Sequence, residues 1–294
     1  MDDTRVYFGD DFGQKIDLTV RIREILRNYP GTTLNRGNVG RSTDEGTSIF
    51  KELVQNADDA GATELAFCLD MRQHSTEHLA YKKMEKFQGP SLVVFNNATF
   101  SDADFESIQR IGDSLKKDSS KGWKTGRFGI GFNSVYHLTD LPAFVSGSHL
   151  VFFDPQACHL PNVNPSNPGK MINFISHPEI VTTYPAQVAP FKVFGCNFMA
   201  PFDGTVFRLA LRSTEQAQVS RLSNRPQTPE HLLEMLQEFG ESIHLVLLFL
   251  RNVSKIKLLK WEEGMEKPVS ICEASINNLN DALRDMRSLR MSMP

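Results

Sequence analysis

The sequence predicts an α+β fold, in which helices and strands form separate layers. Amphipathic stretches with helical spacing occur beside short apolar runs, and several of these runs follow one another without a helix between them. That order favours α+β layering over a doubly wound parallel sheet. Helices are predicted over residues 14–29, 49–60, 101–111, 132–138 and 228–249, and strands over 63–70, 91–95, 143–145, 150–153, 205–211 and 254–261.

Start and stop signals mark most of these helices. The first has an apolar stripe at helical period and stops at Pro30-Gly31. The second ends at Gly61, a residue type suited to the left-handed conformation of a helix cap. Ser101 is a candidate cap for the third, and Thr228 followed by Pro229 predicts the start of the last.

Linkers and loops separate the strands. Residues 31–48 are rich in Gly, Thr, Ser and Asn, which predicts a loop, and residues 161–169 form the most loop-like piece of the second half. After Trp261 the pattern weakens, so residues 262–294 are predicted to be a weakly patterned C-terminal tail. The ordered domain is therefore expected to span residues 10–261.

Composition narrows the class of protein. The 294 residues carry 32 Lys+Arg and 35 Asp+Glu, and this net charge of −3 argues against a bulk electrostatic attraction to nucleic acid. Hydrophobic residues make up 40% of the chain, which excludes wholesale disorder. The four cysteines contain no CxxC pair, so we expect reduced thiols rather than disulfides or a zinc site. The longest apolar stretch, 243–250, is too short to span a bilayer. These features predict a soluble, cytoplasmic protein.

The helix over residues 49–60 carries the most informative polar face. Glu52, Asn56 and Asp59 lie at i, i+4 and i+7 and therefore share one side of the helix. A carboxylate one turn from a carboxamide suits hard-cation chemistry, because Asn supplies a neutral oxygen to Mg²⁺ and Glu orients or deprotonates a water. A solvated polar face is the alternative interpretation.

A glycine-rich turn precedes the helix over residues 132–138. Gly126, Gly129 and Gly131 follow a GxxGxG spacing, which matches neither the dinucleotide fingerprint nor the P-loop. Residues 110–127 hold six Lys/Arg against two Asp, a local charge of +4 that suits a polyphosphate. A tight turn beside a solvated loop is the alternative. Gly204-Thr205, which opens a strand, is likewise either an ordinary turn or a hydroxyl facing a pocket.

The order of these motifs resembles the Bergerat-fold ATPases, the superfamily of gyrase, heat-shock protein 90, histidine kinases and MutL. Closer still, the segments KELVQNADDAGATELAFCLDMR, GRFGIGFNSVYHLTDLP and LVLLFLR resemble the N-terminal ATPase-like module of the Sacsin/Nov family. This resemblance implies a two-layer α/β sandwich, with a mixed or antiparallel sheet and helices on one face. It also implies an ATP and Mg²⁺ site between the Glu52 helix and the 126–131 turn.

The resemblance assigns roles residue by residue. Glu52 stands at the position of the general base for hydrolysis, and Asn56 at that of the Mg²⁺ ligand. Thr205 stands where a hydroxyl meets adenine through water, and residues 112–125 where the family has a lid. The remaining nucleotide-binding positions are Asp59, Ala60, Asn96, Asn97, Gly126, Arg127, Gly129, Gly131 and Phe132.

Two features depart from the family pattern. The adenine-binding DxGxG loop is replaced, with Asn96 or Asn97 at the Asp position and Ala98 and Phe100 at the glycines. A phenyl ring at position 100 is expected to intrude on the purine pocket. Residues 31–44 form an added segment whose removal leaves YPEGTSIFKEL. We interpret it as a gene-model insertion, with a genuine loop as the alternative.

The sequence thus predicts a chaperone or co-chaperone module that responds to Mg-ATP, with weak ATPase activity and with protein clients or other chaperones as partners. Nucleic acid and membrane are not expected partners. The alternative is a nucleotide-free pseudo-ATPase that acts as a protein-interaction scaffold. A kinase or DNA-processing ATPase is disfavoured by the net charge. Because members of the family are usually far longer, a piece of a multi-module protein is expected.

Overall fold

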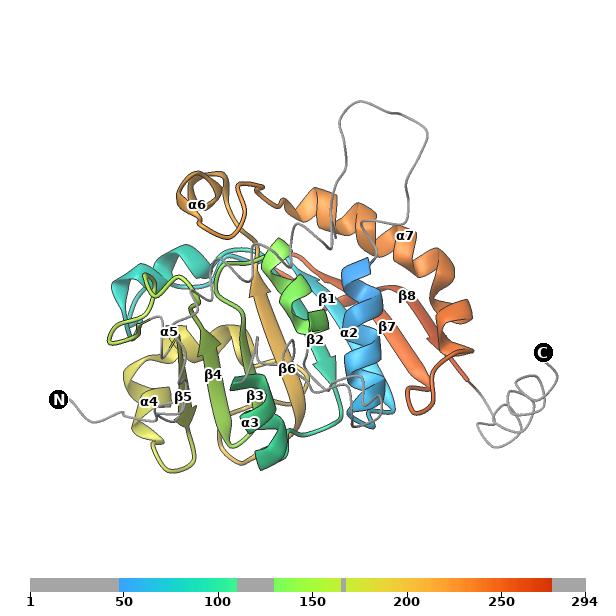
Figure 1. Cartoon of the computed structure of the whole chain (residues 1–294), viewed down its shortest axis with the longest axis horizontal. Helices are drawn as coiled ribbons and strands as arrows, with labels where there is room; N and C mark the ends of the chain where they lie inside the picture. Colours follow the sequence, from blue (N-terminus) through green and yellow to red (C-terminus); the bar gives the residue numbers. More distant parts are fainter. Residues whose placement is uncertain (1–47, 110–129, 165–167, 277–294) are drawn as a thin grey trace, which may run out of the picture.

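The computed structural model describes residues 48–109, 130–164 and 168–276. The described strands form a single eight-stranded sheet (Figure 1). They are β1 (Glu64–Asp70), β2 (Ser91–Asn96), β3 (Ala143–Gly147), β4 (His149–Phe153), β5 (Gly169–Asn173), β6 (Phe202–Ala210), β7 (Lys255–Trp261) and β8 (Val269–Ser275).

Helices flank this sheet. The α-helices in the described ranges are α2 (Ser48–Asp59), α3 (Asp102–Gln109), α4 (Glu179–Thr183), α5 (Pro185–Val188), α6 (Thr214–Val219) and α7 (Pro229–Leu247). The 3₁₀ helices are η1 (Lys82–Phe87), η3 (Ile130–His137) and η4 (Ala189–Phe191). The helix starts predicted at Ser101 and Thr228 are confirmed, because each side-chain oxygen accepts a backbone N–H of the following turn.

The sheet is mixed, and the predicted α+β class is confirmed. The strand order is β5-β4-β3-β6-β2-β1-β7-β8, in which β1 and β7 are parallel and all other neighbours are antiparallel. The parallel pair requires a crossover connection, and α7 leads into β7 across one face of the sheet (Figure 1).

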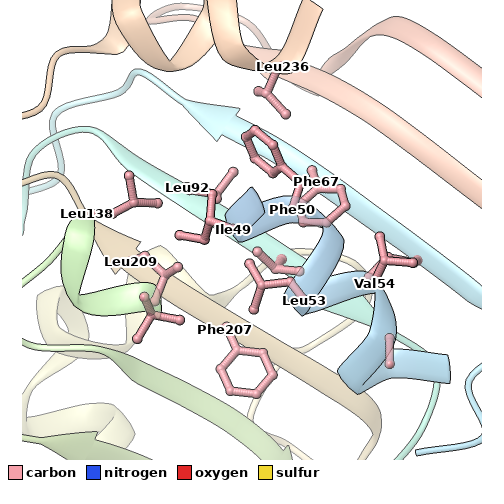
Figure 2. Close-up of a cluster of buried hydrophobic side chains, with 14 of the residues drawn as sticks. Ile49, Phe50, Leu53, Val54, Phe67, Leu92, Leu138, Phe207, Leu209 and Leu236 are labelled. Carbon is pink, nitrogen blue, oxygen red and sulfur yellow. The ribbon is translucent and has the colours of Figure 1, made fainter. Parts of the chain in front are cut away.

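One face of the sheet holds the larger hydrophobic cluster. From α2, the side chains of Phe50 and Leu53 point toward the sheet, where Phe67 and Phe207 meet them (Figure 2). The ring of Phe50 lies 5.2 Å from those of both Phe67 and Phe239 of α7. Burial of these aromatic side chains explains why the apolar stripe of α2 faces inward.

The opposite face is covered as well, which the sequence did not predict. The longer helices share one face, as expected, but α5, η4 and the loops around them bury Val188, Phe191 and Phe198 against β3, β4 and β6. These segments are rich in Pro, Asn and Gly, so they show no helical or strand period. Their apolar residues cover the second face from short helical turns and loops.

The predicted domain boundary at residue 261 lies inside the sheet. Strand β8 falls in the region expected to be a weakly patterned tail, yet it pairs antiparallel with β7. It is an edge strand whose residues are mostly half-buried or exposed, and therefore it lacks the apolar alternation that marks a strand in sequence. The predicted helix over 14–29 and the added segment 31–44 lie outside the described residues.

Gly204 is required where β6 approaches β2. Its φ is +152°, and an added Cβ would lie 2.9 Å from the Asn96 carbonyl oxygen. We expect Gly204→Ala to lower the free energy of unfolding by about 2 kcal/mol, the sum of backbone strain and steric overlap. Gly195→Ala is the matched control, since its φ is +86° but no atom lies near its Cβ. Urea unfolding of both variants checks this, and equal losses would contradict a steric role.

Candidate nucleotide pocket

A small cavity lies between α2, strands β2 and β6, and the loop that follows β2. Its volume is about 20 Å³, space for roughly one water molecule. Polar and apolar side chains share its wall. The lining residues are Leu53, Asn56, Ala57, Ala60, Val94, Asn96, Ala98, Thr99, Phe100, Asp104, Phe132, Thr205 and Phe207.

Helix α2 contributes Asn56 and Ala60 to this wall. Asn56 lines the cavity, and its Nδ2 atom is buried and has no hydrogen-bond partner among the described residues. Glu52, one turn earlier, is half-buried, and burial raises the pKa of its carboxyl group. A carboxylate with a raised pKa is a stronger base than a solvated one.

Asp59 points elsewhere, although it shares the predicted polar face. Its carboxylate lies 3.4 Å from the guanidinium of Arg251, and it is absent from the cavity wall. The neighbouring Asp58, which sequence reasoning missed, is buried and accepts the backbone N–H groups of residues 251–253 at 2.7–3.1 Å. Asp58 therefore joins the end of α2 to the start of β7.

The structure separates the two candidate asparagines. Asn96 is buried in the cavity wall, where its Oδ1 accepts the N–H of Ala98 at 3.0 Å. Asn97 is exposed, and its side chain caps the start of β1 by accepting the N–H groups of Thr63 and Glu64 at 2.8 and 3.0 Å. Of the two, only Asn96 lines this cavity.

Thr205 lies in β6, on the side of the cavity opposite α2. Its hydroxyl donates to the Ala98 carbonyl at 2.7 Å and lies 2.8 Å from the Ser146 hydroxyl. Ser146 in turn accepts the Phe100 N–H at 2.9 Å. This buried network holds the loop after β2 against β3 and β6, and it leaves the Thr205 oxygen as an acceptor for a further donor.

Phe100 occupies the position where the family pattern has glycine. Its ring lines the cavity and packs against Phe144, Phe105 and Phe207 at centroid distances of 4.8, 5.2 and 6.2 Å. A purine base is much larger than the space that remains, so it fits here only where this ring is displaced. The structure therefore places the Phe100 ring in the cavity wall.

The glycine turn contributes only its last part to the described residues. Gly131 lies in the first turn of η3, and Phe132 follows it into the cavity wall. Gly126, Arg127, Gly129 and the predicted lid over residues 112–125 lie outside the described residues. Asp104, which sequence reasoning assigned only to a helix start, also lines the cavity. The sequence did not indicate this position in the wall, because Asp104 also accepts hydrogen bonds from Ser101, as expected of a residue that caps a helix start.

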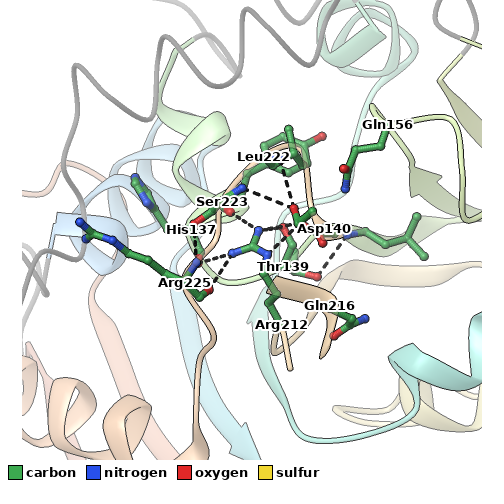
Figure 3. A network of polar contacts seen from close by, with 12 residues as sticks. His137, Thr139, Asp140, Gln156, Arg212, Gln216, Leu222, Ser223 and Arg225 are labelled. Atoms are coloured by element: carbon green, nitrogen blue, oxygen red, sulfur yellow. Dashed lines mark hydrogen bonds and ion pairs between the residues drawn. The ribbon is translucent and has the colours of Figure 1, made fainter. Parts of the chain in front are cut away.

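A buried ion pair fixes the far end of η3 (Figure 3). Arg212 Nε donates to Asp140 Oδ1 at 2.8 Å, and both side chains are inaccessible to solvent. The remaining guanidinium N–H groups donate to backbone carbonyls at 2.7–3.3 Å, so Arg212 holds in place the segment that follows the glycine turn. These carbonyls belong to Tyr136, His137, Thr139 and Arg225.

All four cysteines are free thiols. No helix in the described ranges is both long enough and apolar enough to cross a bilayer.

Comparisons with known proteins place the chain in a family. A family model described as the Sacsin domain matches residues 15–273. Sacsin of Homo sapiens is 39% identical over 264 residues, an alignment that covers 85% of this chain and 5% of the human protein. The chain therefore spans about one twentieth of the length of that relative.

Two solved structures also share similarity with the chain at 12% identity. One is the MutL ATPase domain of Aquifex aeolicus complexed with ADP, which covers 82% of this chain and 68% of its own, with a TM-score of 0.36. The other is the N-terminal domain of a DNA repair protein, and this match covers 79% of this chain and 53% of that protein's chain, with a TM-score of 0.38. The family assignment comes from the sequence model, which matches most of the residues: the chain belongs to the Sacsin domain family.

Proposed function

We propose that this chain is a chaperone-type module that binds Mg-ATP between α2 and the 126–131 turn. The observation that carries the proposal is the convergence of Asn56, Asn96 and Thr205 from three separate elements on one cavity. The unpartnered Nδ2 of Asn56 supports it, because a buried donor without a partner is destabilising unless a ligand satisfies it.

The polar residues fit the proposed ligand. Asn56 would hold Mg²⁺ through its carboxamide oxygen, and Asn96 and Thr205 would accept hydrogen bonds from the base or from water beside it. ATP supplies the phosphoanhydride to be cleaved, and Glu52 would take the proton of the attacking water. Protein clients or other chaperones are the partners proposed for such a module.

One observation favours the scaffold alternative, namely the small volume of the cavity beside Phe100. Displacing a packed phenyl ring costs about 1.5–3 kcal/mol, which reduces apparent affinity by roughly 10–100-fold. A module that never displaces the ring would keep the fold and bind no nucleotide.

Titration of the full chain with Mg-ATP separates these functions. We expect measurable heat from the wild type, about 10-fold or more tighter binding by Phe100→Ala, and weaker binding by Asn56→Ala only when Mg²⁺ is present. Glu52→Gln is expected to retain binding and to lose phosphate release. Circular dichroism shows whether each variant is folded. If neither wild type nor Phe100→Ala binds at millimolar nucleotide, the scaffold function is the correct one.

A further inference from the structure

Three side chains of different donor chemistry meet in the loop that follows β4, in a cluster separate from the nucleotide pocket. Asp154, Cys158 and His159 each offer one ligand atom, and these oxygen, sulfur and nitrogen atoms lie within 4.8 Å of one another.

Asp154 is fully buried and held in place. Its Oδ2 accepts the backbone N–H groups of His159 and Leu160 at 2.6 and 2.9 Å. Its Oδ1 is buried and has no hydrogen-bond partner among the described residues. Such an atom is rare in folded proteins, and it calls for a water, an ion or a functional role.

The imidazole of His159 is positioned by its neighbours. The ring packs edge-on against Phe87, with centroids 5.0 Å apart, and its Nε2 lies 3.5 Å from Gln156 Nε2. These two contacts restrain the orientation of the ring.

Cys158 is exposed, and its chemistry argues against a nucleophile. Partial burial of the thiol, together with the charges of Asp154 and Asp140, raises the pKa of Cys158 to about 11 despite the opposing charges of Lys83 and Arg221. A protonated thiol does not attack substrates, so a Cys-His-Asp catalytic site is disfavoured. A bound cation would replace the thiol proton and offset the two carboxylates.

We propose that Asp154, Cys158 and His159 bind one Zn²⁺ ion, with the fourth coordination position open to solvent. The mixed sulfur, nitrogen and oxygen donor set suits Zn²⁺, whereas Mg²⁺ and Ca²⁺ take oxygen ligands. The exposed Cys158 provides an entry path. The spacing Asp-x₃-Cys-His contains no CxxC pair, so the cysteine spacing of the sequence does not indicate a zinc site here.

Metal binding here would stabilise more than the loop itself. Gln156, within the loop, accepts the N–H of Arg221 at 2.6 Å, and the adjacent Ser220 donates to Asp140 at 2.8 Å. The site is thus linked to the buried ion pair that fixes η3. We therefore expect Zn²⁺ to raise the melting temperature of the chain.

Co²⁺ is a spectroscopic probe for this site. Tag-free full chain, reduced and stripped of metal with a chelator, is titrated with Co²⁺ and then with Zn²⁺. We expect one equivalent of Co²⁺ to give a thiolate charge-transfer band that Zn²⁺ abolishes. Cys158→Ser should remove the band, and His159→Gln should weaken Zn²⁺ binding by about 100-fold or more, since changing an outer-shell partner alone costs 10–100-fold.

The matched control is Cys272→Ser, which removes a partly exposed thiol in β8, outside the Asp154–His159 cluster. This variant should keep the band and the Zn²⁺-dependent rise in melting temperature. The proposal is overturned if the wild type gives neither signal, or if Cys158→Ser, confirmed as folded by circular dichroism, responds to both ions as the wild type does.

Discussion

Arg212→Ala is expected to lower the free energy of unfolding by about 3–5 kcal/mol. The substitution removes the partner of buried Asp140 and leaves an uncompensated charge in the interior. It also removes donors from the backbone carbonyls of Tyr136, His137 and Thr139, of which His137 keeps a hydrogen bond from Gln227. Urea unfolding monitored by circular dichroism measures the loss.

Arg251→Ala is the control, because it removes an arginine side chain that is not buried. The Arg251 side chain is 71% exposed and its ion pair with Asp59 spans 3.4 Å, so its removal should cost at most about 1 kcal/mol. A loss of less than about 1 kcal/mol for Arg212→Ala would show that solvent or neighbouring groups replace its bonds. Asp140→Asn should fall between the two, because it keeps an acceptor and loses the charge.

Asp58→Ala is expected to destabilise the chain by about 3 kcal/mol. Its buried carboxylate accepts three consecutive backbone N–H groups before β7, and a hydrogen bond to a charged acceptor has a net worth of about 1.5–3 kcal/mol. Asp58→Asn retains an acceptor oxygen, and therefore it should recover part of the loss. Thermal and urea unfolding of the two variants give the comparison.

The adjacent Asp59 provides the control for Asp58. Both belong to the same dipeptide, yet Asp59 makes a partly exposed ion pair, and Asp59→Ala should cost about 1 kcal/mol or less. Equal effects of the two substitutions would contradict the assignment of Asp58 as the residue that joins α2 to β7. The contrast depends entirely on which carboxylate is buried.

Regular elements with strong periodicity were predictable. The apolar stripe and Gly61 located α2, and Thr228-Pro229 located α7, since both signals are local. The edge strand β8 was missed because its half-exposed residues do not alternate. The covering of the second sheet face was missed because its apolar residues lie in loops and in helices of three or four residues, which are too short to show a period.

The candidate site divides in the same way. Helical spacing grouped Glu52, Asn56 and Asp59 on one face, but spacing does not tell which of them meets the cavity. Only the packing of α2 directs Asn56 inward and Asp59 toward Arg251. Likewise, the one-residue ambiguity between Asn96 and Asn97 is a strand register, which pairing with β6 decides.

What the sequence by itself determined is the α+β class, the family and the set of polar residues from which a pocket is built. These follow from local periodicity and from motifs whose residues are close together in the chain. Only the tertiary structure decided that Phe100 lies in the wall of the cavity with Asn96 and Thr205, that Arg212 and Asp58 are buried, and that Asp154, Cys158 and His159 converge. The reason is physical: burial and contact depend on residues far apart in sequence, and periodicity carries no information about them.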